Sequence, residues 1–253
     1  MKALVYQKAL GLGKPSDFGK VKDICPFCDY KDFENIIATS GEAIWTRNKY
    51  PVLANTQQTL IIETDKHDAH LGNYEKEEAY NMLKFAFAAW EKMKENKNFK
   101  SVIFYKNHGP LSGGTLSHAH LQIVGLEEVD AYEKIRQVNF EGIDVIKEEA
   151  LEVNFSTQPF CGTRETNILL EKKDFEEYFP RFCEIIQKVF SYHLEMHIFS
   201  FNLFVYDFED QYIVKFTTRF PTAPYFVGFG IPQVIDADSL RAESLVLAKK
   251  LKK

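Results

Sequence analysis

The sequence has few of the features that mark secreted, membrane or nucleic-acid-binding proteins. Four cysteines in 253 residues argue against a disulfide framework. No run approaches the roughly 18 apolar residues of a membrane-spanning helix, and Met1–Lys8 is too mixed in polarity for the apolar core of a secretory signal. The net charge of -5 offers no basic surface for nucleic acid or an anionic membrane. We therefore expect a cytoplasmic protein that binds neither.

The remaining composition is that of an ordinary globular protein, with 45% hydrophobic and 26% charged residues. A chain of this length can form one large domain or two modest ones, each with an ample core. Because the protein as a whole is acidic, its net charge does not attract phosphate. Any phosphate that it binds must be held by hydrogen-bond donors or positive charges grouped in a local site.

One short segment concentrates the chemically useful side chains. Ser117–Val124 has the sequence Ser-His-Ala-His-Leu-Gln-Ile-Val. Side chains at every second position of a strand share one face, so His118, His120 and Gln122 project together while the apolar residues between them point the other way. Two imidazoles and an amide are costly to bury and contribute little packing. This pattern predicts an active-site strand.

A glycine-rich loop over residues 107–116 precedes this strand. Glycines let backbone N–H groups approach a ligand closely and form an anion-binding concavity, to which Gly113 and Gly114 could contribute. An isolated His120 would be interpreted as a core histidine, but its neighbours favour a nucleophile. We expect one ring nitrogen to donate to a backbone carbonyl, which fixes the tautomer and leaves the other free to attack.

The segment from Asn107 to Gln122, with its His-x-His-x-Gln pattern, resembles the galactose-1-phosphate uridylyltransferase branch of the histidine-triad superfamily. That branch includes dinucleotide and nucleoside-diphosphate-sugar phosphorylases, whereas hydrolases of the superfamily carry a third histidine in place of Gln122. The resemblance implies that His120 attacks the α-phosphorus of a nucleotide and that Gln122 stabilises the nucleotidyl-histidine. It also implies that Asn107 and Thr115 contact the transferred phosphate.

The segment Asn48–Pro51 resembles the edge that binds the nucleoside in this family. An ordinary turn after a strand explains the same residues nearly as well. Asn48 is therefore either a nucleoside-binding residue or an ordinary turn residue.

Two cysteines, Cys25 and Cys28, form a Cys-x-x-Cys pair whose thiolates suit tetrahedral zinc. By itself the pair could equally be a redox motif or two small core residues, although no thioredoxin-like context surrounds it. The family resemblance implies His67 and His118 as the other ligands of a structural zinc, with His70 as the rival of His67.

Some family members use a second pair of histidines to hold iron. The corresponding positions here are Thr217 and Arg219, so we expect no iron.

The order strand, helix, strand, strand occurs twice along the chain, which hints at internal duplication. Apolar residues recur at helical spacing over residues 73–95 and 173–193. We expect an α+β fold of two fused histidine-triad-like halves, with antiparallel sheets and packed helices. Residues 1–126 would hold the active site and residues 127–253 a degenerate half. We expect a connecting helix and loop over residues 127–154, and a C-terminal strand over residues 219–230.

The leading interpretation is a nucleotidyltransferase similar to hexose-1-phosphate uridylyltransferases. It would move a nucleoside monophosphate group from a nucleoside diphosphate sugar, or a related nucleotide, to a sugar phosphate or phosphate. One alternative is a phosphorylase or hydrolase of dinucleoside polyphosphates or nucleoside diphosphate sugars. Another is a non-catalytic nucleotide-binding protein. Because family members often dimerise, a homodimer is expected from the resemblance.

Overall fold

The computed structural model describes residues 2–14, 25–28, 33, 35–160 and 164–252. The chain divides into two compact units. Unit 1 comprises Met1–His70 and Glu77–Ile135, and unit 2 comprises Leu71–Lys76 and Arg136–Lys253. None of the described helices is long and apolar enough to cross a membrane.

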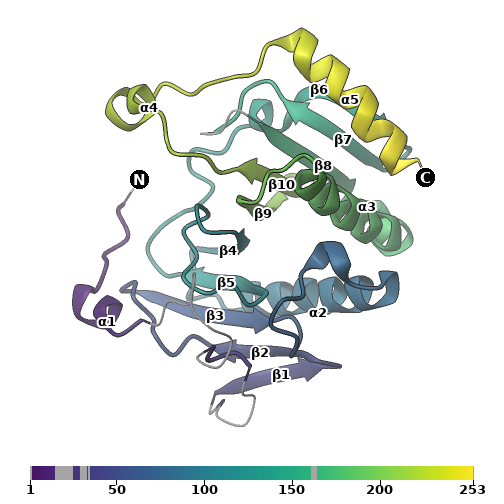
Figure 1. Cartoon of the computed structure of the whole chain (residues 1–253). Helices are drawn as coiled ribbons and strands as arrows, with labels where there is room; N and C mark the ends of the chain where they lie inside the picture. The colour runs from purple at the N-terminus through teal and green to yellow at the C-terminus, as the bar shows by residue number, and fades with distance from the viewer. Residues whose placement is uncertain (1, 15–24, 29–32, 34, 161–163, 253) are drawn as a thin grey trace. The chain divides into compact units, whose positions relative to one another are not determined.

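Unit 1 contains an antiparallel sheet in the order β1-β2-β3-β5-β4 (Figure 1). A short helix, α1, precedes the sheet, and the long helix α2 joins β3 to β4. The bounds of these elements are α1 Lys8–Leu12, β1 Ile36–Ser40, β2 Ala43–Arg47, β3 Thr56–Ile62, α2 Lys76–Lys94, β4 Ser101–His108 and β5 His120–Leu126.

Helix α2 covers one face of this sheet. Its Phe87 and Trp90 rings lie 5.9 and 5.7 Å from the ring of Phe104 on β4. Phe104 stands directly opposite Ile123 of β5, so both side chains point to the α2 face. Side chains alternate along a strand, and His120 and Gln122 therefore project from the opposite face of β5, which α2 does not cover.

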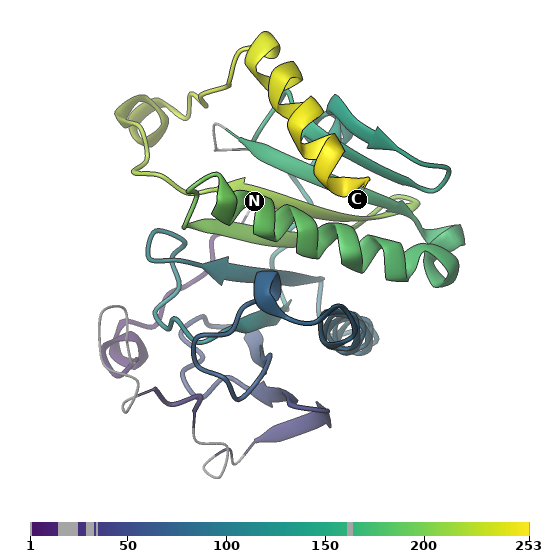
Figure 2. The same cartoon turned by 45° about the vertical axis from the view of Figure 1, so that its right-hand side comes forward.

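Unit 2 contains five further strands, which pair in antiparallel fashion in the order β9-β10-β8-β7-β6. Helices α3 and α5 pack against these strands and against each other (Figure 2). The bounds are η3 Leu71–Asn73, η4 Gln137–Phe140, β6 Gly142–Lys147, β7 Leu151–Ser156, β8 Glu165–Glu171, η5 Lys172–Asp174, α3 Phe175–Glu195, β9 Phe201–Phe208, β10 Gln211–Thr218, α4 Pro224–Phe229 and α5 Ala237–Leu251.

The predicted two-half α+β fold is confirmed. The order β3-α2-β4-β5 in unit 1 recurs as β8-α3-β9-β10 in unit 2, and each set of strands pairs in the same pattern. The registers can be aligned because Ile62 stands opposite His120 in unit 1 and Glu171 stands opposite Gln211 in unit 2. Gln211 thus occupies the place of His120.

The loop before the last strand differs most between the halves. Eleven residues, 109–119, separate β4 from β5, whereas only Glu209 and Asp210 separate β9 from β10. Unit 2 therefore has no counterpart of the glycine-rich loop at this position. That the second half is degenerate stays a prediction.

Two buried or half-buried ion pairs occupy equivalent positions in the halves with their charges exchanged. In unit 1, Glu63 after β3 pairs with Lys106 of β4. In unit 2, Lys172 after β8 pairs with Asp207 of β9 at 2.6 Å. Exchanging the acidic and basic residues leaves an attractive ion pair in each half. The ion pair therefore connects the equivalent two strands in both halves.

The prediction of a connecting helix over residues 127–154 is wrong. Strands β6 and β7 occupy most of that segment, preceded by the single 3-10 turn η4. Charged residues alternate there with buried ones such as Val145 and Val153, which suits a strand with one exposed face. The same charges are also typical of a solvated connection, which is why the sequence pattern predicts one.

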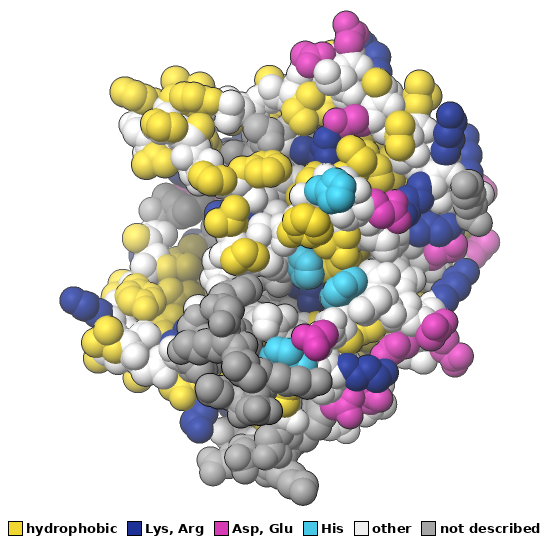
Figure 3. Space-filling view, viewed as in Figure 1, with side chains coloured by type: hydrophobic (Ala, Val, Ile, Leu, Met, Phe, Trp, Pro, Cys, Tyr) yellow, Lys and Arg dark blue, Asp and Glu magenta, His cyan; other side chains and the backbone are white. Residues whose placement is uncertain are grey.

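The prediction of a strand over residues 219–230 is also wrong. Helix α4 begins at Pro224, whose fixed φ suits a first helical turn. It ends at Phe229 and is followed by Gly230 in the left-handed conformation with φ 67°. Its Tyr225, Val227 and Phe229 are exposed. Figure 3 shows hydrophobic side chains gathered over this segment.

Candidate active site and metal centre

Four residues from distant parts of unit 1 form a group that could hold a metal ion. They are Cys25, Cys28, His67 and His118, and their ligand atoms all lie within 4.8 Å of one another. The cysteines belong to a tight turn in which the Cys28 N–H donates to the Cys25 carbonyl at 3.2 Å. His67 follows β3, and His118 lies just before β5. The described cysteines Cys25, Cys28 and Cys183 form no disulfide, while Cys161 lies outside the described residues.

The distances within the group fit one tetrahedral ion. The Nδ1 atom of His118 is 3.7 Å from Cys25 Sγ and 3.5 Å from Cys28 Sγ, and His67 Nδ1 is 3.2 Å from Cys28 Sγ. Bond lengths typical of zinc sites give sulfur–nitrogen separations of about 3.6 Å in a regular tetrahedron. His118 Nε2 donates to the Thr64 carbonyl at 2.8 Å, which leaves Nδ1 with a lone pair for the metal.

His70 is not part of this group. Its ring lies instead beside the ring of His108, with a centroid distance of 5.8 Å. Of the two histidines in the Lys66–His70 segment, His67 is the one that the structure brings to the cysteines.

His120 is buried and held in one tautomer. Its Nδ1 donates to the carbonyl of His118 at 2.8 Å, which confirms that a backbone carbonyl accepts this hydrogen bond and identifies which one. Nε2 is then the nitrogen with an available lone pair. Burial lowers the pKa of His120 to about 4, so the ring is neutral near pH 7.

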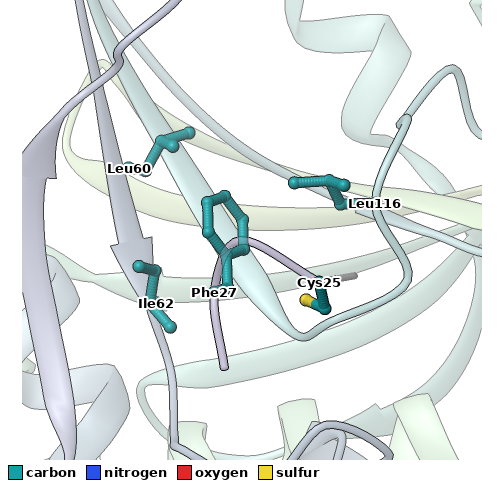
Figure 4. Close-up of a cluster of buried hydrophobic side chains, with 5 residues drawn as sticks. All are labelled: Cys25, Phe27, Leu60, Ile62 and Leu116. Atoms are coloured by element: carbon teal, nitrogen blue, oxygen red, sulfur yellow. The ribbon is translucent and has the colours of Figure 1, made fainter. Parts of the chain in front are cut away.

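Phe27 links the cysteine turn to His118 and His120. Its ring lies 5.3 Å from that of His120 and 5.9 Å from that of His118, edge-on in each case. Figure 4 shows Phe27 among Cys25, Leu60, Ile62 and Leu116, with which it forms a buried cluster. The sequence analysis missed Phe27, although its position between the two cysteines places it beside any metal that they bind.

The backbone of His120 is supported from the α2 face by a buried ion pair. Lys106 Nζ donates to the Glu63 carboxylate and also to the His120 carbonyl, the latter at 3.4 Å. Both side chains are almost fully buried. The sequence analysis missed this pair as well. Lys106 is the only charged residue of β4, a signal that could have identified it.

Gln122 accepts a hydrogen bond from the strand beside it. The Tyr105 hydroxyl donates to Gln122 Oε1 at 2.9 Å, and the two residues stand directly opposite each other on β4 and β5. Burial raises the pKa of Tyr105 to about 12, so the phenol keeps its proton. Asn107 lies two residues beyond Tyr105, on the same face of β4.

The loop after β4 packs closely on Asn107. Gly113 has φ +86°, a conformation that favours glycine, and a Cβ added to Gly114 would lie only 3.1 Å from Asn107 Cβ. The Ser112 hydroxyl closes the loop by donating to the Gly109 carbonyl at 2.6 Å. Thr115 follows, partly buried. The structure thus brings Asn107 and Gly114 together.

Asn48 lies in the turn after β2. Its Oδ1 accepts the Tyr50 N–H at 2.9 Å, which stabilises the turn. A nucleoside contact by Asn48 stays a prediction.

Solved structures define the class of this fold. A uridylyltransferase matches with a TM-score of 0.70 and 14% identity, covering 92% of this chain and 93% of that chain. An ADP-glucose phosphorylase from Arabidopsis thaliana with bound ADP-glucose matches with a TM-score of 0.68 and 11% identity, covering 96% and 93%. At these identities the likeness concerns the fold, which is the two-half, histidine-triad-like fold of uridylyltransferases.

The chain belongs to the DUF4931 family. The N-terminal domain of this family (domain of unknown function, DUF4931) matches residues 6–129, and its C-terminal domain matches residues 132–246. The crystal structure of a DUF4931 family protein from Bacillus cereus ATCC 10987 has 37% identity and a TM-score of 0.77, covering 87% of this chain and 100% of that chain. A comparison with curated proteins finds none that matches this chain.

Proposed function

We propose that this protein is a nucleotidyltransferase that works through a nucleotidyl-histidine on His120. One observation carries the proposal: the Nδ1 of His120 is engaged by the His118 carbonyl. The Nε2 lone pair is therefore available on the strand face that also bears Gln122. A histidine that only filled the core would need neither Gln122 beside it on the same strand face nor a glycine-rich loop before the strand.

In the first step, His120 Nε2 attacks the α-phosphorus of a nucleotide donor. A phosphorus–nitrogen bond forms while the bond to the bridging oxygen breaks, and the leaving phosphate takes that electron pair. In the second step, a phosphate oxygen of the acceptor attacks the same phosphorus. The phosphorus–nitrogen bond breaks and neutral His120 is restored.

The residues around His120 would stabilise the charged phosphoryl group. We propose that Gln122 donates to the nucleotidyl group and that Asn107 and Thr115 bind its oxygens. Backbone N–H groups at Gly113 and Gly114 would complete the phosphate site, because charge spread over the equatorial oxygens needs donors already in place. Asn48 would contact the nucleoside.

The metal proposed for the cysteine and histidine group is a structural zinc. Cys25, Cys28, His67 and His118 would supply four protein ligands, which leaves no open position for substrate. When bound, the ion would stabilise the turn and the start of β5. The distances reported above support this proposal.

The substrates proposed are a nucleoside diphosphate sugar or related nucleotide, and a sugar phosphate or phosphate as acceptor. The fold relatives include a uridylyltransferase, an ADP-glucose phosphorylase and a yeast Ap4A phosphorylase in complex with Ap4A. They support nucleotide chemistry in general. The phosphorylases among them make inorganic phosphate the second candidate acceptor.

We further propose that residues 1–126 carry the chemistry and that residues 127–253 form the degenerate half. Gln211 stands where His120 would be by register.

The test of this function is adduct formation without an acceptor. Purified protein is mixed with UDP-sugars, ADP-sugars or dinucleoside polyphosphates, and intact mass is measured. We expect a mass increase of one nucleotidyl group that is stable in base and labile in acid, as for a phosphoramidate. Adding a sugar phosphate, phosphate or neither then distinguishes a transferase, a phosphorylase and a hydrolase. If no donor yields an adduct, the non-catalytic binding protein becomes the better explanation.

Gln122→Ala tests the proposed role of the amide. We expect adduct formation about 10²-fold slower than in the wild type, since one hydrogen-bond donor to developing charge is lost. The nucleophile remains, so the adduct should still accumulate. Rapid-quench mass spectrometry gives the rate, and complete loss of the adduct would contradict the assigned role.

His193 in unit 2 should contribute to acid sensitivity rather than to catalysis. It is buried, its Nδ1 donates to the Val189 carbonyl, and its ring stacks on Phe216 at 5.2 Å. Burial lowers its pKa from 6.5 to about 4. The unfolded chain therefore binds the additional proton between these two pH values, and stability falls as the pH drops through that window.

Urea unfolding at pH 7 and pH 5 measures this contribution. In His193→Gln, we expect the loss of stability between the two pH values to be about 2 kcal/mol smaller than in the wild type. The control is His197→Asn, because His197 is exposed and has the left-handed φ that Asn tolerates. An unchanged pH dependence in His193→Gln would refute this prediction, and a large loss of nucleotidyl transfer in His193→Ala would show that the site is misplaced.

A further inference from the structure

The side-chain amide of Gln122 has two chemically opposite ends. Its oxygen accepts hydrogen bonds and its NH2 group donates them. Toward an anionic phosphoryl group, the NH2 end is attractive and the oxygen end is repulsive. The usefulness of Gln122 therefore depends on which end faces the substrate.

The Tyr105 hydroxyl distinguishes the two ends. It lies 2.9 Å from Gln122 Oε1 and donates its proton there. With the oxygen engaged on the β4 side, the NH2 group is left for other partners. The reversed amide would lose this acceptor for the Tyr105 proton.

The fold holds Tyr105 in place for this contact. Antiparallel register puts Tyr105 directly opposite Gln122. The phenol packs against a buried cluster formed by Val124, Leu126 and Val129. Packing against these neighbours restricts the rotamers of the Tyr105 side chain. Its hydroxyl therefore stays in position to donate to Gln122.

We propose that Tyr105 is a positioning residue that orients the Gln122 amide so that its NH2 group faces the nucleotidyl group on His120. This inference rests on the proposed function. It adds a residue on β4, outside the His-x-His-x-Gln segment, that acts on the reaction only through Gln122.

Tyr105→Phe removes the hydroxyl and keeps the ring. We expect the rate of adduct formation to fall about tenfold, which corresponds to the loss of one hydrogen bond of about 1.4 kcal/mol. The KM for the donor should stay unchanged, because the ring packing and the nucleoside contacts remain. The control is Tyr178→Phe, which removes a surface hydroxyl that bonds Glu149 at 3.3 Å in unit 2 and should leave the rate unchanged.

A double-mutant cycle separates positioning from a general structural effect. If Tyr105 acts through Gln122, Tyr105→Phe should have no further effect on the rate in the Gln122→Ala background. A further tenfold loss in that background would overturn the inference, because a structural effect would add to the first substitution.

Gln122→Glu provides a second, independent variant. A carboxylate still accepts the Tyr105 hydrogen bond but has no N–H to offer the phosphoryl group. We expect its rate to be at or below that of Gln122→Ala, and a rate near the wild type would overturn the inference.

The outcomes distinguish this inference from the proposed function. If wild-type protein forms no adduct with any donor, the proposed function fails and the inference fails with it. If wild-type protein forms the adduct and Tyr105→Phe does so at the wild-type rate, only the inference fails. Circular dichroism and thermal unfolding establish that each variant is folded.

Discussion

His120→Ala should form no nucleotidyl adduct with any donor that modifies the wild type. Nε2 is the proposed nucleophile, and alanine offers no atom that can replace it. We expect the rate of nucleotidyl transfer to fall by at least about 10³-fold, or about 4 kcal/mol of transition-state stabilisation. The measurement is intact-protein mass after incubation with donor, followed by peptide mapping of the wild-type adduct to His120.

The same variant should keep its fold and its metal. His120 is not among the four residues whose ligand atoms converge, whereas His118 is. The matched control is His197→Ala, in which an exposed histidine of unit 2 is removed and the adduct should form normally. Adduct formation in His120→Ala at the wild-type rate, or an adduct mapped to His108, would refute the assigned mechanism.

Removal of the metal should destabilise the protein. We expect about one zinc per chain in protein purified without added metal, measured by elemental analysis. Chelation or Cys28→Ser should lower the melting temperature by about 10 °C, because binding of a structural metal contributes directly to folding. The loss of stability should also affect the position of His120, because the metal group holds His118 and because Phe27 packs against both histidines.

The control for the cysteine substitution is Cys183→Ala. Cys183 is buried on α3 in unit 2, and burial raises its pKa, so it is an inert thiol remote in sequence from the metal group. This variant should retain the metal even if it loses some packing energy. The structural zinc would be excluded if the wild-type protein were purified without metal and its melting temperature did not change on addition of a chelator.

The comparison of unit 1 with unit 2 supports the proposal that only unit 1 carries an active site. The strands and the long helix recur, but the loop between β4 and β5 is long and glycine-rich, whereas the loop between β9 and β10 has two residues. A two-residue connection cannot surround a phosphate. His120 is replaced by Gln211 at the equivalent register position.

Features that depend on short spacings could be predicted from the sequence. The period of two predicted that His120 and Gln122 share a strand face, whereas His118, predicted on the same strand, lies just before β5. The Cys25–Cys28 spacing predicted a pair of thiols suited to one metal ion. Helical periodicity located α2 and α3, although α2 begins at Lys76 because residues 71–73 form a 3-10 turn. His67 was found through the family resemblance. The prediction for residues 127–154 is wrong because charges on the exposed face of β6 and β7 resemble those of a solvated connection.

Which distant residues meet depends on tertiary packing, which local sequence patterns do not report. The convergence of Cys25 with His118 requires the turn to pack on β5 through Phe27. The Tyr105 hydroxyl reaches Gln122 because antiparallel register places the two residues opposite each other. Glu63 and Lys106 pair because β3 and β4 flank β5. Strand register and long-range packing depend on the whole core, whereas the sequence patterns report only local periodicity and spacing.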